Sequence, residues 1–262
     1  LIGVLTDHVH TPRAIAKRMM EYHLDKDYTM RVAEHLGNPK KEKIYNIYSI
    51  EEISEMSFSC PNCALLMKAP NSTQQRPTLG IPDTKFVLLN DRAKMITKAP
   101  IRVIDLSLLE LHNSRTFWDI GACTGSVSIE ARRQYPHLNI QAFEVREECK
   151  DIIRANARLH SAPGIDLHIG NFLNLPIAEN AIVDAVFIGG HGGKLKEIIC
   201  KVASHLDKLK GKIVFNSVSE ESNKLFREAV EENDLKLHSE MNITVDSNNP
   251  ITILCATGKY HV

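Results

Sequence analysis

The sequence has 262 residues, 43% of them hydrophobic, and its 32 basic side chains are balanced by 32 acidic ones. Such a chain can build a core, but it offers no general basic surface for nucleic acid. No apolar run approaches the roughly 20 residues that span a bilayer. We therefore expect a soluble, cytoplasmic protein with no nucleic-acid or membrane partner, made of two domains rather than one. Leu1 stands within an apolar run, so we also expect the chain to start inside a strand.

The six cysteines are too few and too scattered for a disulfide framework. Cys60 and Cys63 have the spacing of a metal-ligand pair. A closed zinc site needs four ligands, however, and the sequence has no second Cys pair or His pair to supply the other two. We expect an ordinary turn here and no metal, with a metal or redox role as the alternative.

Residues 1 to about 70 alternate short apolar runs with amphipathic stretches, which indicates α/β structure. Thr11 and Pro12 are typical of the first residues of a helix. Strands are predicted at 2–6, 28–36 and 63–69, and a helix at 11–23.

Residues 70–84 carry three prolines among mostly polar neighbours, which is typical of a linker. We place a domain boundary there and expect domains at 1–84 and 85–262.

The second domain opens with a predicted amphipathic helix over 97–113, in which Ile101 and Leu108 share a face. Predicted strands follow at 115–121, 139–144, 165–170, 183–190 and 211–217, and predicted helices at 127–135, 146–160, 194–209 and 219–232. This alternation indicates a parallel, doubly wound α/β sheet.

The last two apolar runs, 235–245 and 251–258, are joined by a turn-forming segment and predict an antiparallel hairpin. Five parallel strands closed by such a hairpin predict the Rossmann-like methyltransferase fold. A nicotinamide-binding domain would more often continue with a further crossover.

The segment DIGACTGS follows the first strand of this sheet and resembles a dinucleotide fingerprint, G-x-G-x-x-G. The second glycine of that fingerprint lets the backbone approach a pyrophosphate, and the third lets the helix pack against the strand. Here Cys123 and Ser126 stand at those two positions. The spacing of Asp119, Gly121, Cys123 and Gly125 instead resembles the loop of S-adenosylmethionine (SAM) methyltransferases, so we expect SAM as the cofactor.

Glu144 ends the next predicted strand, 19 residues after Gly125. A carboxylate at this place accepts hydrogen bonds from both ribose hydroxyls and repels a 2′-phosphate, which excludes NADP more firmly than NAD.

Ligands in open α/β sheets bind beyond the carboxyl ends of the strands, so two further segments belong to the same rim. Asn171 and Phe172 are placed to flank an adenine. His191 lies in the glycine-rich segment 189–193 and would project into the cleft. Ordinary turns and a solvated histidine are the alternatives.

The segments KMITKAPIR, FWDIGACTGSVSIEA, AFEVREEC and GGHGGKLKEII together resemble the decarboxylating precorrin-6Y C(5,15)-methyltransferases of cobalamin biosynthesis. The resemblance extends over nearly the whole chain. Residues from about 91 onward resemble the C-terminal domain, which in that family methylates carbon 15 of the corrin precursor and decarboxylates an acetate side chain. Residues 1 to about 70 resemble the second half of the α/β tetrapyrrole methylase domain that acts at carbon 5. Because the first half is absent from the sequence, we expect no carbon 5 activity.

The resemblance implies site residues and partners. The implied SAM contacts are Thr97, Asp119, Gly121, Ala122, Cys123, Thr124, Gly125, Glu144, Asn171 and Phe172. For the anionic tetrapyrrole substrate we nominate Lys98, Arg102, Gly190, Gly192 and Lys194, and for proton transfer His191. Relatives of the C-terminal domain imply a homo-oligomer, possibly a tetramer.

Three other functions stay open. They are a NAD-dependent oxidoreductase, a nucleic-acid methyltransferase and a non-catalytic tetrapyrrole-binding or assembly subunit. The zero net charge disfavours the second of these, as does the lack of an Asn/Asp-Pro-Pro-aromatic motif after the fourth strand.

Overall fold

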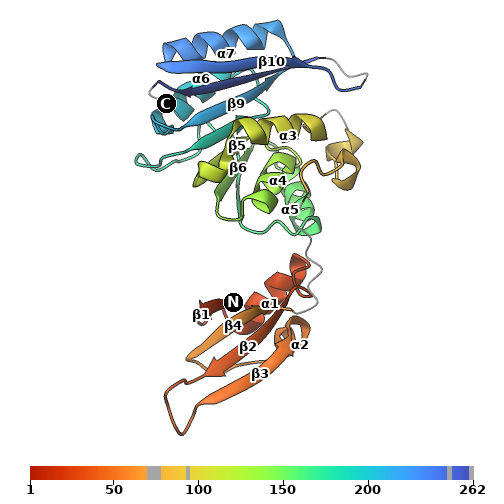
Figure 1. Ribbon diagram of the computed structural model, residues 1–262, viewed down its shortest axis with the longest axis vertical. Helices are drawn as coiled ribbons and strands as arrows, with labels where there is room; N and C mark the ends of the chain where they lie inside the picture. The colour runs from red at the N-terminus through yellow and green to blue at the C-terminus, as the bar shows by residue number, and fades with distance from the viewer. Residues whose placement is uncertain (70–77, 93–94, 247–249, 260–262) are drawn as a thin grey trace. The chain divides into compact units, whose positions relative to one another are not determined.

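The computed structural model describes residues 1–69, 78–92, 95–246 and 250–259 (Figure 1). It contains two compact units, built mainly from residues 1–77 and 78–262. Residues 70–77 of the expected linker and 247–249 of the expected hairpin turn lie outside the described residues. None of the described helices is long and apolar enough to cross a membrane.

The N-terminal unit is a four-stranded antiparallel sheet with the strand order β1-β4-β2-β3. Its elements are β1 (Ile2–Leu5), α1 (Pro12–Glu21), β2 (Tyr28–Glu34), β3 (Lys43–Ser49), α2 (Ile50–Glu55) and β4 (Asn62–Lys68). The predicted strands β1, β2 and β4 and the helix α1 are confirmed, and the Thr11 hydroxyl accepts the Ala14 amide as the N-cap. β3 and α2 are absent from the sequence-based prediction, although Ser49 and Glu52 form a capping box at the start of α2.

Cys60 lies two residues before β4, and Cys63 is the second residue of that strand. Cys60 is exposed and precedes Pro61, while Cys63 is half-buried within the strand. No group of three His, Cys, Asp or Glu side chains in the described part of the chain is placed to hold a metal ion.

The C-terminal unit is a seven-stranded sheet with the order β10-β11-β9-β8-β5-β6-β7. Its elements are α3 (Ala99–Leu108), β5 (Thr116–Ile120), α4 (Ser126–Gln134), β6 (Asn139–Glu144), α5 (Cys149–Leu159), β7 (Ile165–Ile169), β8 (Ala185–Ile188), α6 (Leu195–His205), β9 (Lys212–Ser217), α7 (Glu220–Glu232), β10 (Leu235–Ile243) and β11 (Ile251–Gly258). β5 to β9 are parallel, and β11 is antiparallel to both of its neighbours. The predicted Rossmann-like methyltransferase fold with its terminal hairpin is confirmed.

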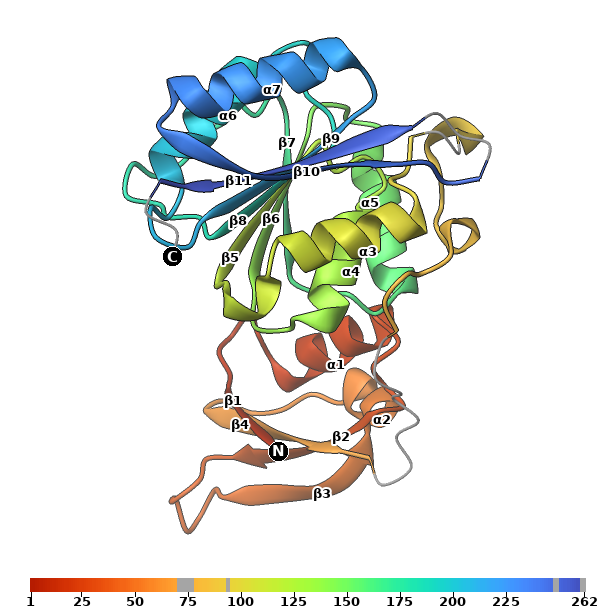
Figure 2. The same cartoon turned by 45° about the horizontal axis from the view of Figure 1, so that its top comes forward.

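Helices cover both faces of this sheet, with α6 and α7 on one face and α3, α4 and α5 on the other (Figure 2). Alternate residues of β5 belong to two different cores: Phe117 is in the core that includes Ile101 of α3, whereas Trp118 is in the core that includes Leu195 of α6. α3 ends before the predicted residue 113 because Glu110 has a left-handed backbone, with φ 47°.

Asp105 of α3 is a carboxyl group with 0% exposure. Its Oδ2 atom accepts a hydrogen bond of 2.7 Å from Nδ2 of Asn216 at the end of β9. Oδ1 of Asp105 and Oδ1 of Asn216 have no hydrogen-bond partner among the described residues. Burial raises the pKa of Asp105 to about 8. The neutral acid suits this place, because burial disfavours the charged carboxylate.

We expect Asp105→Asn to remove a pH dependence of the free energy of unfolding. The pKa of Asp105 is about 8 in the folded protein against an ordinary value of 3.8. The stabilisation from this group is therefore complete below about pH 4 and is lost progressively as the pH rises toward 8. In urea unfolding at a series of pH values, the variant should gain stability relative to the parent up to about pH 8 and no further. A difference that stays constant over this range would contradict the raised pKa.

Candidate functional site

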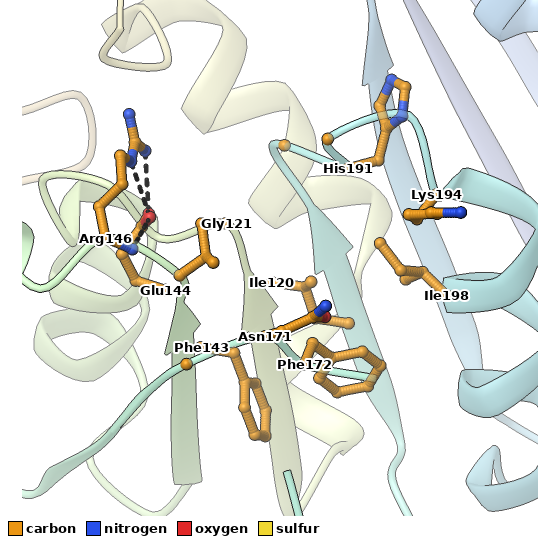
Figure 3. Close-up of a pocket in the computed structure, with 14 residues that line it drawn as sticks. Ile120, Gly121, Phe143, Glu144, Arg146, Asn171, Phe172, His191, Lys194 and Ile198 are labelled. Carbon is orange, nitrogen blue, oxygen red and sulfur yellow. Dashed lines mark hydrogen bonds and ion pairs between the residues drawn. The ribbon is translucent and has the colours of Figure 1, made fainter. Parts of the chain in front are cut away.

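The strand order reverses direction at β5, which has β6 and β7 on one side and β8 and β9 on the other. At such a switch point the loops that follow two neighbouring strands run to opposite faces and leave a crevice between them. A cavity of about 320 Å³ lies there, at the carboxyl ends of the parallel strands (Figure 3). This volume is at the lower end of the range for small-molecule sites, roughly 300 to 1,000 Å³.

The cavity is lined by the ends of four strands and by the start of α6. The lining residues are Ile120, Gly121, Phe143, Glu144, Val145, Arg146, Gly170, Asn171, Phe172, Gly190, His191, Gly192, Lys194 and Ile198. Half of the predicted site residues are among them: Gly121, Glu144, Asn171, Phe172, Gly190, His191, Gly192 and Lys194.

Gly121 brings two loops into close contact. Its backbone has φ +79°, and a Cβ atom at this position would lie 2.6 Å from the backbone nitrogen of Gly190. Because the obstructing atoms belong to the backbone of Gly190, they cannot move away as a flexible side chain could. Glycine is therefore required where the loops after β5 and β8 approach each other.

Cys123 has the left-handed backbone that glycine usually adopts, with φ 52°. Its side chain is buried in an apolar cluster with Ala142, Cys149 and Ile153 and does not line the cavity. Burial raises the pKa of the Cys123 thiol. A cysteine at this position therefore leaves the ligand side of the loop open.

Glu144 closes β6 and is 2% exposed. Its Oε2 atom accepts hydrogen bonds from the Cys123 amide (2.8 Å) and from Nη2 of Arg146 (3.0 Å). Its Oε1 atom accepts from the Arg146 amide (3.0 Å) and from Nε of Arg146 (2.8 Å) (Figure 3). Burial raises the pKa of Glu144, but the bonds from Arg146 and Cys123 outweigh it and hold the pKa below its ordinary value. The strand end thus carries a full negative charge.

Asp119 does not line the cavity. It is 1% exposed, and its Oδ2 atom accepts hydrogen bonds from the amide (3.1 Å) and the hydroxyl (2.6 Å) of Ser128 in α4. Burial raises its pKa to about 6. Asp119 therefore fixes the start of α4 against β5, and a direct contact with a cofactor stays a prediction.

His191 stands at the opposite wall from Glu144 (Figure 3). Its Nδ1 atom accepts the Gly193 amide at 3.2 Å, and its Nε2 atom is 3.5 Å from the hydroxyl of Ser222. Burial lowers the pKa of His191. Since Nδ1 is an acceptor, the ring is neutral with its proton on Nε2.

The loop that carries Asn171 and Phe172 is held by Lys201 of α6. The Lys201 ammonium donates to the carbonyl oxygens of Phe172 (2.8 Å), Leu173 (3.2 Å) and Leu175 (2.9 Å). Burial lowers its pKa. Lys201 therefore fixes the wall of the cavity that the two predicted adenine neighbours form.

Arg102 is fully buried, which corrects its prediction as a substrate ligand. Its guanidinium pairs with Asp83 (2.8 Å) and Glu130 (3.1 Å) and donates to the carbonyl oxygens of Thr97 and Ile81. The guanidinium is enclosed by these protein groups and is not accessible to a substrate. The structure therefore assigns Arg102 to holding the segment before α3 in place.

The remaining predicted residues lie outside the cavity lining. Lys98 pairs with Asp83 at 3.4 Å, in the cluster around Arg102. The others are Thr97, Ala122, Thr124 and Gly125, and their contact with a cofactor stays a prediction.

Arg146 and Lys201 are functional candidates that the sequence-based prediction misses. Arg146 stands two residues after the predicted strand end, and this closeness is the signal that could have found it. The sequence shows Lys201 only as a polar residue of a predicted helix. Its contact with the loop after β7 depends on the tertiary structure.

Comparison with known proteins places the chain in a family. A family model described as the precorrin methyltransferase domain matches residues 89–253. The cobalt-precorrin-6B C(15)-methyltransferase (decarboxylating) of Salmonella typhimurium is 35% identical over 127 residues, which are 48% of this chain and 64% of that protein. The precorrin-6Y C(5,15)-methyltransferase [decarboxylating] of Mycobacterium tuberculosis is 25% identical over 226 residues, 84% of this chain and 53% of that protein. The chain thus spans only part of the length of these relatives.

Among solved structures, the precorrin-6Y C5,15-methyltransferase of Geobacter metallireducens is 32% identical with a TM-score of 0.62. The similarity covers 70% of this chain and all of that one. Its fold and that of the C-terminal unit agree. The chain belongs to the precorrin methyltransferase family.

Proposed function

We propose that this chain binds SAM and methylates carbon 15 of a precorrin-6B-type tetrapyrrole, with decarboxylation of an acetate side chain. The observation that carries the proposal is Glu144, a buried carboxylate at the end of β6 that faces a cavity at the switch point of the sheet. The name of the Salmonella typhimurium relative contains methylation at carbon 15 with decarboxylation, and that of the Geobacter metallireducens structure contains methylation at carbons 5 and 15.

The residues of the cavity fit SAM. Glu144 has the place of a ribose acceptor, and Phe172 and Asn171 lie on the next strand end, where an adenine would follow the ribose. The contact between Gly121 and the backbone of Gly190 gives a ligand close access to main-chain atoms. A pyrophosphate at the loop would meet the carboxylate of Glu144, which already accepts the Cys123 amide at 2.8 Å.

SAM, when bound, supplies a methyl group on a sulfonium, which is a good leaving group. The contribution of the protein is then to align the substrate carbon with the methyl group and to exclude water. Apolar side chains that line the cavity, among them Ile120, Phe143 and Ile198, form a wall that excludes water. Lys194 lies at the opening with 61% of its side chain exposed, as suits a partner for a substrate carboxylate.

His191 is the candidate for proton transfer. Loss of carbon dioxide breaks the bond to the acetate carboxyl carbon, and its electron pair must receive a proton to leave a methyl group. His191 lines the cavity, and its ring would take up a second proton from water and, as an imidazolium, deliver it in this step.

The N-terminal unit belongs to the proposal as well. We assign residues 1–84 to the second half of a tetrapyrrole methylase domain with its linker and 85–262 to the methyltransferase domain. The similarity to the Mycobacterium tuberculosis relative supports this, because it extends over 84% of the chain. The proposal further includes a homo-oligomer and a cytoplasmic location.

Incubation with SAM and precorrin-6B tests the function. Release of carbon dioxide together with the gain of a single methyl group supports it. Titration with NAD is the parallel arm, and binding of NAD without binding of SAM would exclude the proposal. Binding of the tetrapyrrole without turnover would indicate an assembly subunit instead.

For His191→Ala we expect turnover to fall on the order of 100-fold, within the usual range for general acid–base groups. Binding of S-adenosylhomocysteine (SAH), measured by calorimetry, should stay unchanged, because the ring is on the wall opposite Glu144. His191→Gln, which keeps a polar side chain without a titrating ring, should be as slow as the alanine variant. Turnover equal to that of the parent would remove His191 from the reaction.

A further inference from the structure

Arg146 saturates the carboxylate of Glu144. A carboxylate offers about four acceptor positions, and the structure fills two on each oxygen. On Oε1 these are taken by the amide and Nε of Arg146, and on Oε2 by the Cys123 amide and Nη2 of Arg146. Two of the four donors are thus backbone groups, and two belong to one guanidinium.

The guanidinium occupies the positions that a ribose needs. Nε and Nη2 give one hydrogen bond to each carboxylate oxygen, at 2.8 and 3.0 Å. The 2′ and 3′ hydroxyls of a ribose form the same kind of two-pronged contact with a carboxylate. The backbone donors from Cys123 and Arg146 are compatible with a ribose, but the side chain of Arg146 is not.

We propose that the Arg146 side chain and the cofactor ribose compete for Glu144, so that binding of the cofactor frees the guanidinium for a carboxylate of the substrate. This inference rests on the proposed function. It makes Arg146 a positioning residue that favours binding of the cofactor before the anionic substrate.

The charges around the cavity support the exchange. Glu144 is the single carboxylate among the described residues that line it, so the lining offers a displaced guanidinium no second anion. The side chain of Arg146 is 30% exposed and lines the same cavity, within reach of an incoming ligand. Lys194, the other cation in the lining, already has Glu197 at 3.3 Å. An anionic substrate would supply the missing partner.

Calorimetry with SAH and with uroporphyrin, a polycarboxylate tetrapyrrole, tests the inference. In the parent protein, saturating SAH should tighten uroporphyrin binding by about fivefold or more, in the usual range of coupling between two sites. Arg146→Met should bind SAH several-fold more tightly than the parent, because the competitor is gone, and the coupling should disappear. Arg146→Lys keeps the charge but lacks the planar fork, so it should also bind SAH more tightly and keep part of the coupling.

Arg154→Met is the matched control, because Arg154 is an exposed arginine of α5 away from the cavity lining. It should match the parent in both affinities. SAH binding to Arg146→Met that is equal to or weaker than the parent, or coupling that persists in this variant, would overturn the inference while the proposed function stands. If the parent binds no SAH, both the inference and the proposed function fall.

Discussion

Glu144→Gln is expected to weaken SAH binding on the order of 100-fold, since hydrogen bonds to a charged group contribute about 1.5 to 3 kcal/mol each. The glutamine keeps one oxygen for the Cys123 amide, which Glu144 accepts at 2.8 Å, so the loop should retain its conformation. What it loses is the negative charge and the acceptor positions for the second ribose hydroxyl. Calorimetry measures the affinity, and circular dichroism checks the fold.

Glu147→Gln is the control for this experiment. Glu147 stands three residues further on, 69% of its side chain is exposed, and it pairs with Lys150. An exposed pair contributes about 0 to 1 kcal/mol, and neither of its residues lines the cavity, so SAH affinity should not change. Equal affinities for Glu144→Gln and Glu147→Gln would remove Glu144 from the cofactor site.

Arg102→Met is expected to lower the free energy of unfolding by about 3 to 5 kcal/mol, the usual cost of removing one partner of a buried ion pair. The substitution leaves Glu130, which is 1% exposed, without its cationic partner and frees two carbonyl oxygens that Arg102 now satisfies. The amides of Gly80 and Ile81 still donate to Glu130 and keep part of the network. Urea unfolding at neutral pH measures the loss.

Arg227→Met provides the comparison, because Arg227 also pairs with two carboxylates, Glu220 and Glu240, but has 38% of its side chain exposed. Its loss should be about 1 kcal/mol or less. Adding Glu130→Gln to Arg102→Met should recover part of the stability, because it removes the unpaired charge. If the two arginine variants lose the same stability, the buried network around Arg102 does not stabilise the fold.

The strands of the C-terminal unit could be predicted because their sequence pattern is local. Runs such as Thr116–Ile120 and Asn139–Glu144 are short, contain several apolar side chains and are separated by amphipathic helices, and this pattern also sets the direction of each strand. Once the direction is known, Glu144 must lie at the edge where ligands bind. The same reasoning predicts the place of His191, whose role in the reaction stays a prediction.

The role of Arg102 could not be predicted, because burial of a charged side chain depends on partners far apart in the chain. Asp83 and Glu130 are 19 and 28 residues away from it, and neither is marked by a local pattern. The contact of Lys201 with the loop after β7 bridges a similar span. The expected lack of carbon 5 activity concerns chemistry outside this site and stays a prediction.

The left-handed backbone of Cys123 bears on how such sites are found in other sequences. Its side chain packs into the protein interior. The residue type at this position is therefore constrained by the backbone conformation and by the neighbouring apolar cluster. A search pattern that demands glycine at this position would discard chains whose loop has the same path. A pattern that fixes Gly121, where a side chain would meet the backbone of Gly190, and leaves position 123 open follows the actual constraint.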